Sequence, residues 1–282
     1  MSSLTSKLYK YLAQLSLAAT IPFFISFNSA NADDNVVRLA VVNTPASSGL
    51  LDHLLEAFEA ESGYTVEVYS GSDVYDVAEN GSADIVISHF GKSGLEAFVQ
   101  NQMGRWPTIV FSNQSVIIGP QDDPANIKGL TSATEAFRRI AETESSFVTN
   151  RGAGSVYLTN ILREGANWPA DAGWVHDEGG DKARAVRLAE EEQGYTIWGA
   201  LPFLRFQRAS DTEMEILVSE DPLLQRIMAA VVVNPEKVEG VNVRGAEALQ
   251  EYLVKPETQA KVGAFRTADS DLQLWWPSGR DN

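Results

Sequence analysis

Apolar and polar positions along the chain form blocks whose spacing changes between that of a strand and that of a helix. Segment 39–42 is a short apolar run, whereas the apolar residues of segment 50–58 recur at helical spacing. The pattern then predicts a strand at 65–69, a short helix at 76–79 and a buried strand at 83–87. This alternation predicts an α/β fold with a parallel sheet and right-handed crossovers.

A polar turn follows each of these three strands, at 43–48, 70–73 and 88–93. Because ligands of parallel α/β folds bind beyond the carboxyl ends of the strands, these turns are expected to form one binding rim. The candidate ligand-binding residues on this rim are Asn43, Thr44, Ser47, Ser72 and His89. Hydroxyl and amide donors, together with the free amides at the start of a helix, favour a small anion.

Two of these candidates also have structural explanations. Ser47 or the neighbouring Ser48 can cap the following helix, since serine is a preferred N-cap residue. His89 can be a structural hydrogen-bonding residue, because no second ligand-type residue lies at a metal-binding spacing from it. No metal site and no resident cofactor are therefore expected.

A second α/β pattern begins after two apolar runs at 108–111 and 116–120. The turn Asp122-Asp123-Pro124 follows them and is a strong break. Beyond it the sequence predicts a helix at 133–142, a strand at 147–148, a glycine-rich loop at 150–155 and a helix at 156–164. The polar loop that follows the first strand of the chain therefore has a counterpart here.

The glycine-rich loop contributes three further candidates, Arg151, Gly152 and Ser155. Arg151 is the first choice for binding an anion, because a guanidinium is a fixed cation whose fork geometry suits oxyanions. The alternative for Arg151 is a surface ion pair, and the alternative for Ser155 is a helix N-cap.

The remaining pattern completes a two-domain arrangement. A helix is predicted at 181–192, strands at 194–199, 213–218 and 228–235, and amphipathic helices at 246–253 and 256–265. We expect domain I at 33–119 plus 230–282 and an inserted domain II at 120–229, with two crossings near Gly119 and Val231. A cleft between two such domains closes by hinge motion around a solute.

The first 32 residues have the pattern of a cleaved secretory signal. Lys7 and Lys10 precede a largely apolar stretch at 12–27, and small residues end at Ala32, after which cleavage is expected. The apolar stretch is shorter than the roughly 20 residues that span a bilayer. A periplasmic protein without a membrane anchor is therefore expected.

Composition and charge narrow the set of partners. The chain has no cysteine, which excludes disulfides and a thiol nucleophile. With 38 acidic and 22 basic residues, the formal net charge of −16 argues against nucleic acid and anionic membranes as partners. A small anion can still be held by neutral donors and helix ends. A monomer is expected, and the tail that contains Trp275-Trp276 is expected to pack on the surface.

The motifs that usually identify an enzyme are missing from the sequence. It contains no nucleophile elbow, phosphate-binding loop, dinucleotide fingerprint or His-Glu-x-x-His motif. A secreted hydrolase built on Ser155, His89 and Asp84 is the alternative, but a binding protein rather than an enzyme is expected.

Several motifs distributed over the chain point to one family. They are Ser48-Gly49-Leu50-Leu51-Asp52, Glu79-Asn80-Gly81, Val116-Ile117-Ile118-Gly119-Pro120, Asp122-Asp123-Pro124-Ala125, Ile127-Lys128-Gly129, Arg151-Gly152, Gly194-Tyr195-Thr196 and Val233-Asn234-Pro235-Glu236-Lys237. In these motifs the sequence resembles the periplasmic tungstate-binding proteins of ABC importers, which have the type II solute-binding fold. The resemblance implies a two-lobed α/β fold, a small oxyanion of tungstate or molybdate type as the ligand, and an ABC transporter permease as a partner.

The resemblance also implies how the site is divided. Asn43 and Thr44 are expected to hold one side of the anion, and Arg151 with the amides of segment 152–155 the other. Departures from the family pattern occur at Val41, Val42, Asp73, Ala153 and Gly199. They keep a second hypothesis open, in which the same scaffold binds another small anion or an organic solute.

Overall fold

The computed structural model describes residues 35–90, 94–268 and 272–278. The signal sequence and cleavage site expected in segment 1–32 lie outside the described residues. Residues 32–282 form one compact unit. Within the described ranges, none of the helices has the length and apolar character needed to cross a membrane.

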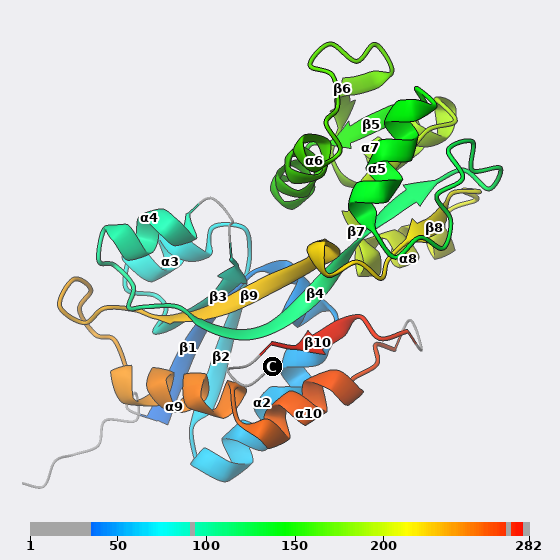
Figure 1. The fold of residues 1–282 in the computed structure, drawn as a ribbon. Coiled ribbons are helices and arrows are strands. Elements are labelled where there is room, and N and C mark those ends of the chain that lie inside the picture. Colours follow the sequence, from blue (N-terminus) through cyan, green and yellow to red (C-terminus); the bar gives the residue numbers. More distant parts are fainter. Residues whose placement is uncertain (1–34, 91–93, 269–271, 279–282) are drawn as a thin grey trace, which may run out of the picture. The chain divides into compact units, whose positions relative to one another are not determined.

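The main sheet combines parallel and antiparallel strands in the order β10-β4-β9-β3-β1-β2 (Figure 1). These strands are β1 (Val36–Val41), β2 (Thr65–Ser70), β3 (Ile85–His89), β4 (Thr108–Gly119), β9 (Gln225–Val232) and β10 (Trp275–Pro277). The parallel pairing expected among the first three strands is confirmed, since β1 pairs in parallel with both β2 and β3. In contrast, β9 runs antiparallel between β3 and β4, so the sheet as a whole is mixed.

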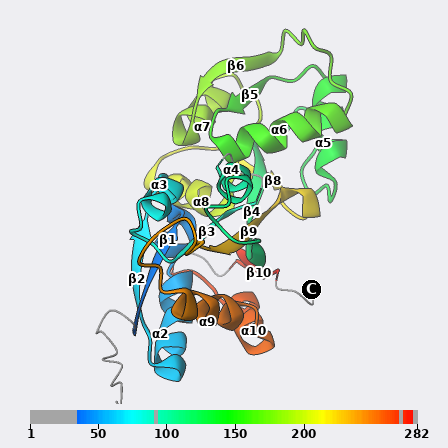
Figure 2. The same ribbon diagram turned by 90° about the vertical axis from the view of Figure 1, so that its left-hand side faces the viewer.

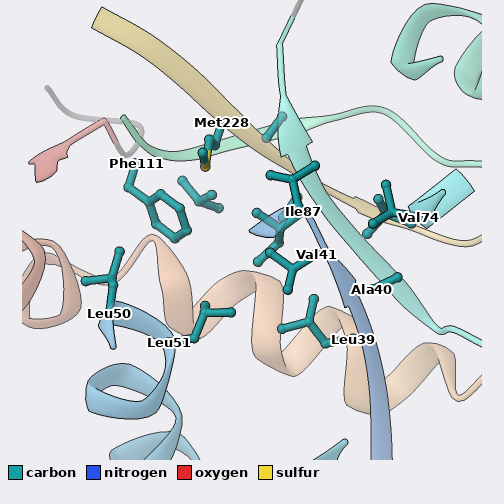
Figure 3. Close-up of a cluster of buried hydrophobic side chains, with 14 of the residues drawn as sticks. Leu39, Ala40, Val41, Leu50, Leu51, Val74, Ile87, Phe111 and Met228 are labelled. Atoms are coloured by element: carbon teal, nitrogen blue, oxygen red, sulfur yellow. The ribbon is translucent and has the colours of Figure 1, made fainter. Parts of the chain in front are cut away.

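Helices cover both faces of the part of the sheet that contains β1, β2 and β3 (Figures 1 and 2). One face carries α2 (Leu50–Ser62), α9 (Val243–Leu253) and α10 (Pro256–Ala264), and the other carries α3 (Val74–Glu79) and α4 (Leu95–Gln100). Figure 3 shows side chains of α2, β1, β3, β4 and β9 meeting in one apolar cluster. The burial of these apolar side chains holds β1 and β3 in place, and the polar turns follow the carboxyl ends of these strands.

A second group of elements surrounds the far end of β4. It comprises α5 (Ala133–Glu142), β5 (Phe147–Asn150), α6 (Ala153–Gly165), β6 (Val175–Gly180), α7 (Lys182–Glu191), β7 (Thr196–Gly199), α8 (Ala200–Ala209), β8 (Glu215–Val218) and a 3-10 turn at Pro222–Leu224. Phe137, Phe147 and Trp168 pack against one another at its centre. The sequence pattern predicted α5 and α7 closely but did not predict β6 or α8.

β4 joins these two groups of elements. Residues 108–114 pair with β9, whereas residues 115–119 pair with β7 and β8. The sequence has two apolar runs here, at 108–111 and 116–120, with the polar residues Asn113-Gln114-Ser115 between them. In the structure both runs belong to one continuous strand, and the three polar residues line a cavity. Their polarity therefore reflects the cavity.

The first polar turn contains a short helix that was not predicted. α1 spans Asn43–Ser47 and ends two residues before Gly49, whose φ of 82° marks the turn into α2. Glycine adopts this left-handed conformation without the steric penalty of a Cβ. The expected role of Ser47 as the cap of α2 is not observed, since Gly49 is the N-cap and the Ser48 hydroxyl accepts a bond from Leu50 N–H at 3.3 Å.

The expectation that the tail packs on the surface is wrong for Trp275. This side chain is 0 % exposed and meets Phe111 edge-on, with ring centroids 5.4 Å apart. The tail adds β10 to the edge of the sheet, where it pairs with residues 111–113 of β4. Two effects account for this docking. Pairing with β10 gives hydrogen-bond partners to backbone groups at the edge of β4, and burial of the large Trp275 ring removes apolar surface from water.

Candidate functional site

A cavity of about 190 Å³ lies where β4 changes its pairing partners. It receives side chains from the end of β3, the middle of β4, the start of β9 and β10, and from the starts of α6 and α8. The lining residues are Thr44, His89, Asn113, Gln114, Ser115, Gly152, Gly154, Ser155, Lys182, Trp198, Gly199, Ala200, Leu201, Pro202, Arg226, Leu274 and Trp275. Hydrogen-bond donors and two cationic side chains therefore converge in one space.

Three of the lining residues form a row across the sheet. Trp275 of β10 lies opposite Asn113 of β4, and Asn113 lies opposite Arg226 of β9. Directly opposed residues of antiparallel strands point to the same face of a sheet. His89 joins this row from β3, because its Nε2 lies 3.3 Å from Asn113 Oδ1. The pairing register thus gathers an indole, an amide, an imidazole and a guanidinium along one wall.

Arg226 extends from β9 to the first turn of α6. A Cβ added at Gly154 would overlap Arg226 Nη1, so the absence of a side chain at Gly154 is what lets the guanidinium approach the helix backbone. Burial lowers the pKa of Arg226 from its usual value, and the neighbouring Tyr157 acts in the opposite direction. No described residue forms an ion pair with Arg226.

The start of α6 adds further positive potential next to Arg226. Gly152 is the N-cap of this 13-residue helix, and its carbonyl accepts bonds from the amides of Ser155 and Val156. The first amides of a helix lack partners one turn earlier, and the helix dipole places partial positive charge there. The partly buried guanidinium of Arg226 and this helix end therefore place positive potential on the same side of the cavity.

The structure places four of the eight predicted site residues at this cavity. Thr44, His89, Gly152 and Ser155 are among its lining residues. They come from the first polar turn, the end of β3 and the glycine-rich loop, which the sequence treated as parts of one site.

The other four predicted residues are not among those that line the cavity. Asn43 is exposed and accepts a hydrogen bond from Ser70 Oγ at 3.0 Å, and Ser72 is exposed on the next turn. Ser47 is exposed and its carbonyl oxygen accepts a bond from Arg205 Nη2 at 2.8 Å. The Arg151 side chain is also exposed, although its backbone N–H donates to Gly180 O at 2.9 Å.

Asp73, one of the departures from the family pattern, is not among the residues that line the cavity. It is exposed and accepts a hydrogen bond of 2.7 Å from the hydroxyl of Tyr69, which raises the pKa of Tyr69. Its carboxylate therefore adds no negative charge to the cavity lining. Val41 and Val42, two further departures, are buried in the apolar core.

The three residues considered for a hydrolase, Ser155, His89 and Asp84, do not come together at the cavity. Ser155 and His89 line the cavity, but Asp84 does not. The carboxylate of Asp84 is fully buried, where it pairs with Arg38 at 2.5 Å and accepts from Asn242 N–H at 2.9 Å. Asp84 is therefore part of the packing of β1 and not a partner for His89.

Arg226 is the main site residue that the sequence analysis missed. A signal for it exists, because Met228 lies two residues further along the same strand and is fully buried. Residues two apart in a strand point to the same face, so Arg226 is predicted to point inward with Met228. The other polar or aromatic lining residues outside the predicted set are Asn113, Gln114, Ser115, Lys182, Trp198 and Trp275.

Comparison with known proteins supports a family assignment. A family model described as a PBP superfamily domain matches residues 28–257. A putative ABC transporter anion-binding protein of Haloferax volcanii is 28 % identical over 257 residues, which cover 89 % of this chain and 74 % of the relative. Tungstate-binding protein TupA of Peptoclostridium acidaminophilum is 25 % identical, with 86 % of this chain and 85 % of the relative covered.

Two solved structures have similar folds and sequences. Tungstate-binding protein TupA from Desulfovibrio alaskensis G20 superposes with a TM-score of 0.77 and 25 % identity, covering 87 % of this chain and 99 % of that one. The tungstate ABC transporter structure from Geobacter sulfurreducens gives a TM-score of 0.67 and 26 % identity, covering 82 % and 99 %. The names of the Haloferax, Peptoclostridium and Desulfovibrio relatives specify binding proteins, in agreement with the binding protein expected from the sequence.

Proposed function

This chain belongs to the PBP superfamily, and from that premise we propose that it is a solute-binding protein for a small oxyanion of tungstate or molybdate type. The anion occupies the cavity beside Arg226 and is delivered to an ABC transporter through its permease. The protein acts as a monomer in the periplasm, after removal of a signal peptide at Ala32.

One observation carries the proposal. Arg226 is desolvated, has no ion-pair partner among the described residues and lies beside the positively polarised start of α6. Arg226 is only partly exposed to water, and a partly desolvated charge without a counter-charge is unfavourable, so an anion at this place would be stabilising. Tetrahedral oxyanions present only acceptors, which suits a wall made of a guanidinium, helix amides and the donor groups of Thr44 and Ser155.

The relatives support the class of ligand and partner. Their names specify an anion, tungstate or an ABC transporter. The acidic surface of this chain does not oppose this assignment, because the charges that act on a buried ligand are those that line its cavity.

We propose that the ligand closes two lobes, one formed by 33–119 plus 230–282 and the other by 120–229. The cavity takes lining residues from both segments, and β4 divides its pairing between β9 on one side and β7 and β8 on the other. An anion that contacts both lobes only when they are closed shifts the equilibrium toward the closed state.

The ligand class is tested by a thermal-shift panel of tungstate, molybdate, sulfate, phosphate and small carboxylates. An anion present at about 100 times its Kd adds about 2.7 kcal/mol of stability, which for a chain of this size raises Tm by roughly 5–11 °C. Stabilisation by a tetrahedral oxyanion is the expected result. If none of them raises Tm, the oxyanion assignment is wrong.

A second candidate ligand is an organic anion on the same scaffold. Trp198, Leu201 and Pro202 give the cavity an apolar wall next to its cations. Such a wall can pack against the hydrocarbon part of a carboxylate. Stabilisation by a carboxylate without any response to tetrahedral anions would favour this candidate.

Lobe closure has its own measurement. Small-angle X-ray scattering of the mature protein is expected to give a smaller radius of gyration when the stabilising anion is present. The control is an anion from the same panel that does not change Tm. An unchanged radius with a bound anion would contradict closure without affecting the assignment of the ligand.

A further inference from the structure

A hydrogen bond joins α1 and α8 across the two proposed lobes. Arg205 of α8 donates through Nη2 to the carbonyl oxygen of Ser47, the last residue of α1, at 2.8 Å. Both helices lie at the cavity, because Thr44 of α1 and the residues at the start of α8 are among those that line it. The bond therefore connects the segments 33–119 and 120–229 beside the place where the anion is proposed to bind.

The donor and the acceptor of this bond suit each other chemically. The last carbonyl groups of a helix have no amide partner further along the helix, and basic side chains commonly bond to them. Arg205 is only partly exposed to water, and a charged donor makes a stronger hydrogen bond than a neutral one. The contact is therefore stabilising as long as the two helices keep this separation.

Each of the two helices is anchored by packing in its own lobe. On α8, Leu201 and Phe203 are buried, and the guanidinium of Arg187 lies over the ring of Phe206, 5.0 Å from its centroid. On α1, Pro45 is buried. Because both helices are held in this way, each is expected to move with its own lobe when the lobes open.

The bond depends on the separation of the lobes. A donor and an acceptor about 3.6 Å apart no longer form a hydrogen bond, so a hinge opening that separates α1 from α8 by more than the arginine side chain can follow breaks the contact. An interaction that exists only in the closed arrangement shifts the equilibrium toward that arrangement.

We propose that the bond from Arg205 to Ser47 is a latch that holds the lobes closed and keeps Thr44 at the cavity, which makes Arg205 a positioning residue for anion binding. This inference rests on the proposed function, because it needs lobes that close around a ligand. The latch is a contribution to closure that the protein itself supplies before the anion arrives. Its main effect is on the rate of release, because a bound anion leaves only after the lobes open.

The first test compares Arg205→Gln with Arg208→Gln in the mature protein. Arg208 is the matched control, since it carries the same charge on the same helix, is exposed and is not among the residues that line the cavity. Stopped-flow fluorescence follows dissociation of the oxyanion that stabilises the wild type, with Trp198 in the cavity lining as the reporter. Arg205→Gln is expected to raise the dissociation rate constant about threefold to tenfold with little change in the association rate constant. Arg208→Gln is expected to change both rate constants by about twofold or less.

A second test needs no ligand. The chain has no cysteine, so Asn160→Cys in one lobe and Lys237→Cys in the other, both at exposed positions, allow specific spin labelling. Pulsed electron paramagnetic resonance of the ligand-free labelled protein is expected to give a longer mean distance between the labels after Arg205→Gln than with Arg205 in place. The distance after Arg208→Gln is expected to be unchanged.

The outcomes distinguish this inference from the proposed function. An unchanged dissociation rate or an unchanged distance between the labels in Arg205→Gln would overturn the latch and leave the proposed ligand in place. If the wild type binds no anion of the panel, the proposed function is overturned, and the distance measurement alone decides whether Arg205 holds the lobes together.

Discussion

Replacing Arg226 with glutamine is expected to raise the Kd for the anion by at least about a hundredfold, because removing one partner of a buried charge pair costs about 3–5 kcal/mol. The same change is expected to leave the Tm of the ligand-free protein unchanged or to raise it. The reason is that the wild-type guanidinium is desolvated without a counter-charge, and glutamine removes that cost. Titration calorimetry and thermal denaturation of the two ligand-free proteins measure both effects.

Arg151→Gln is the matched control for this experiment. The Arg151 side chain is exposed and is not among the residues that line the cavity. An exposed charge is screened by water and salt, so its removal is expected to change the Kd by about twofold or less. The sequence alone favours the opposite result, with Arg151 as the cation of the site. A large loss of affinity in Arg151→Gln with normal binding by Arg226→Gln would show that the anion lies elsewhere.

Gly154→Ala is expected to weaken anion binding by about tenfold to a hundredfold without lowering stability. The new Cβ would overlap Arg226 Nη1, and the flexible end of the arginine must then move away from the start of α6. A displaced guanidinium loses its charge-assisted bonds to the anion, each worth about 1.5–3 kcal/mol. Stability is expected to be maintained because alanine favours a helix by about 1 kcal/mol over glycine.

The control for Gly154→Ala is Gly165→Ala at the other end of the same helix. A Cβ at Gly165 would meet only Thr134, at 3.4 Å or more, and this position is not among the residues that line the cavity. Binding by Gly165→Ala is expected to be normal. The double variant of Gly154→Ala and Arg226→Gln should bind no more weakly than Arg226→Gln alone, because both changes remove one interaction. Additive losses in the double variant would contradict the proposed contact.

The local pattern of the sequence was sufficient for most of the regular elements. The helices predicted at 133–142 and 181–192 correspond closely to α5 and α7, and the strands at 65–69 and 83–87 to β2 and β3. Their amphipathic or apolar spacing is a property of neighbouring residues, so it can be read without knowing the fold. The same reasoning correctly predicted a parallel arrangement of the first three strands.

Local pattern failed where pairing with a distant strand decided the structure. The two apolar runs at 108–111 and 116–120 belong to one strand, β4, because β7, β8 and β9 pair with it on both sides of the polar segment 113–115. The tail looked like a surface segment, but β10 pairs with β4 about 160 residues away in the chain. Hydrogen bonds to partners this far apart leave little trace in the local spacing of side chains.

The sequence determined the family resemblance, the order of most elements and the four polar loops around which an anion site was expected. It placed Thr44, His89, Gly152 and Ser155 in that site, and the structure brings all four to one cavity. Only the tertiary structure decided that Arg226 and Trp275 lie beside them and that the Arg151 side chain is exposed. The identity of a site's cation depends on which side chain is desolvated and unpaired, and that property arises from packing between strands and helices distant in the chain.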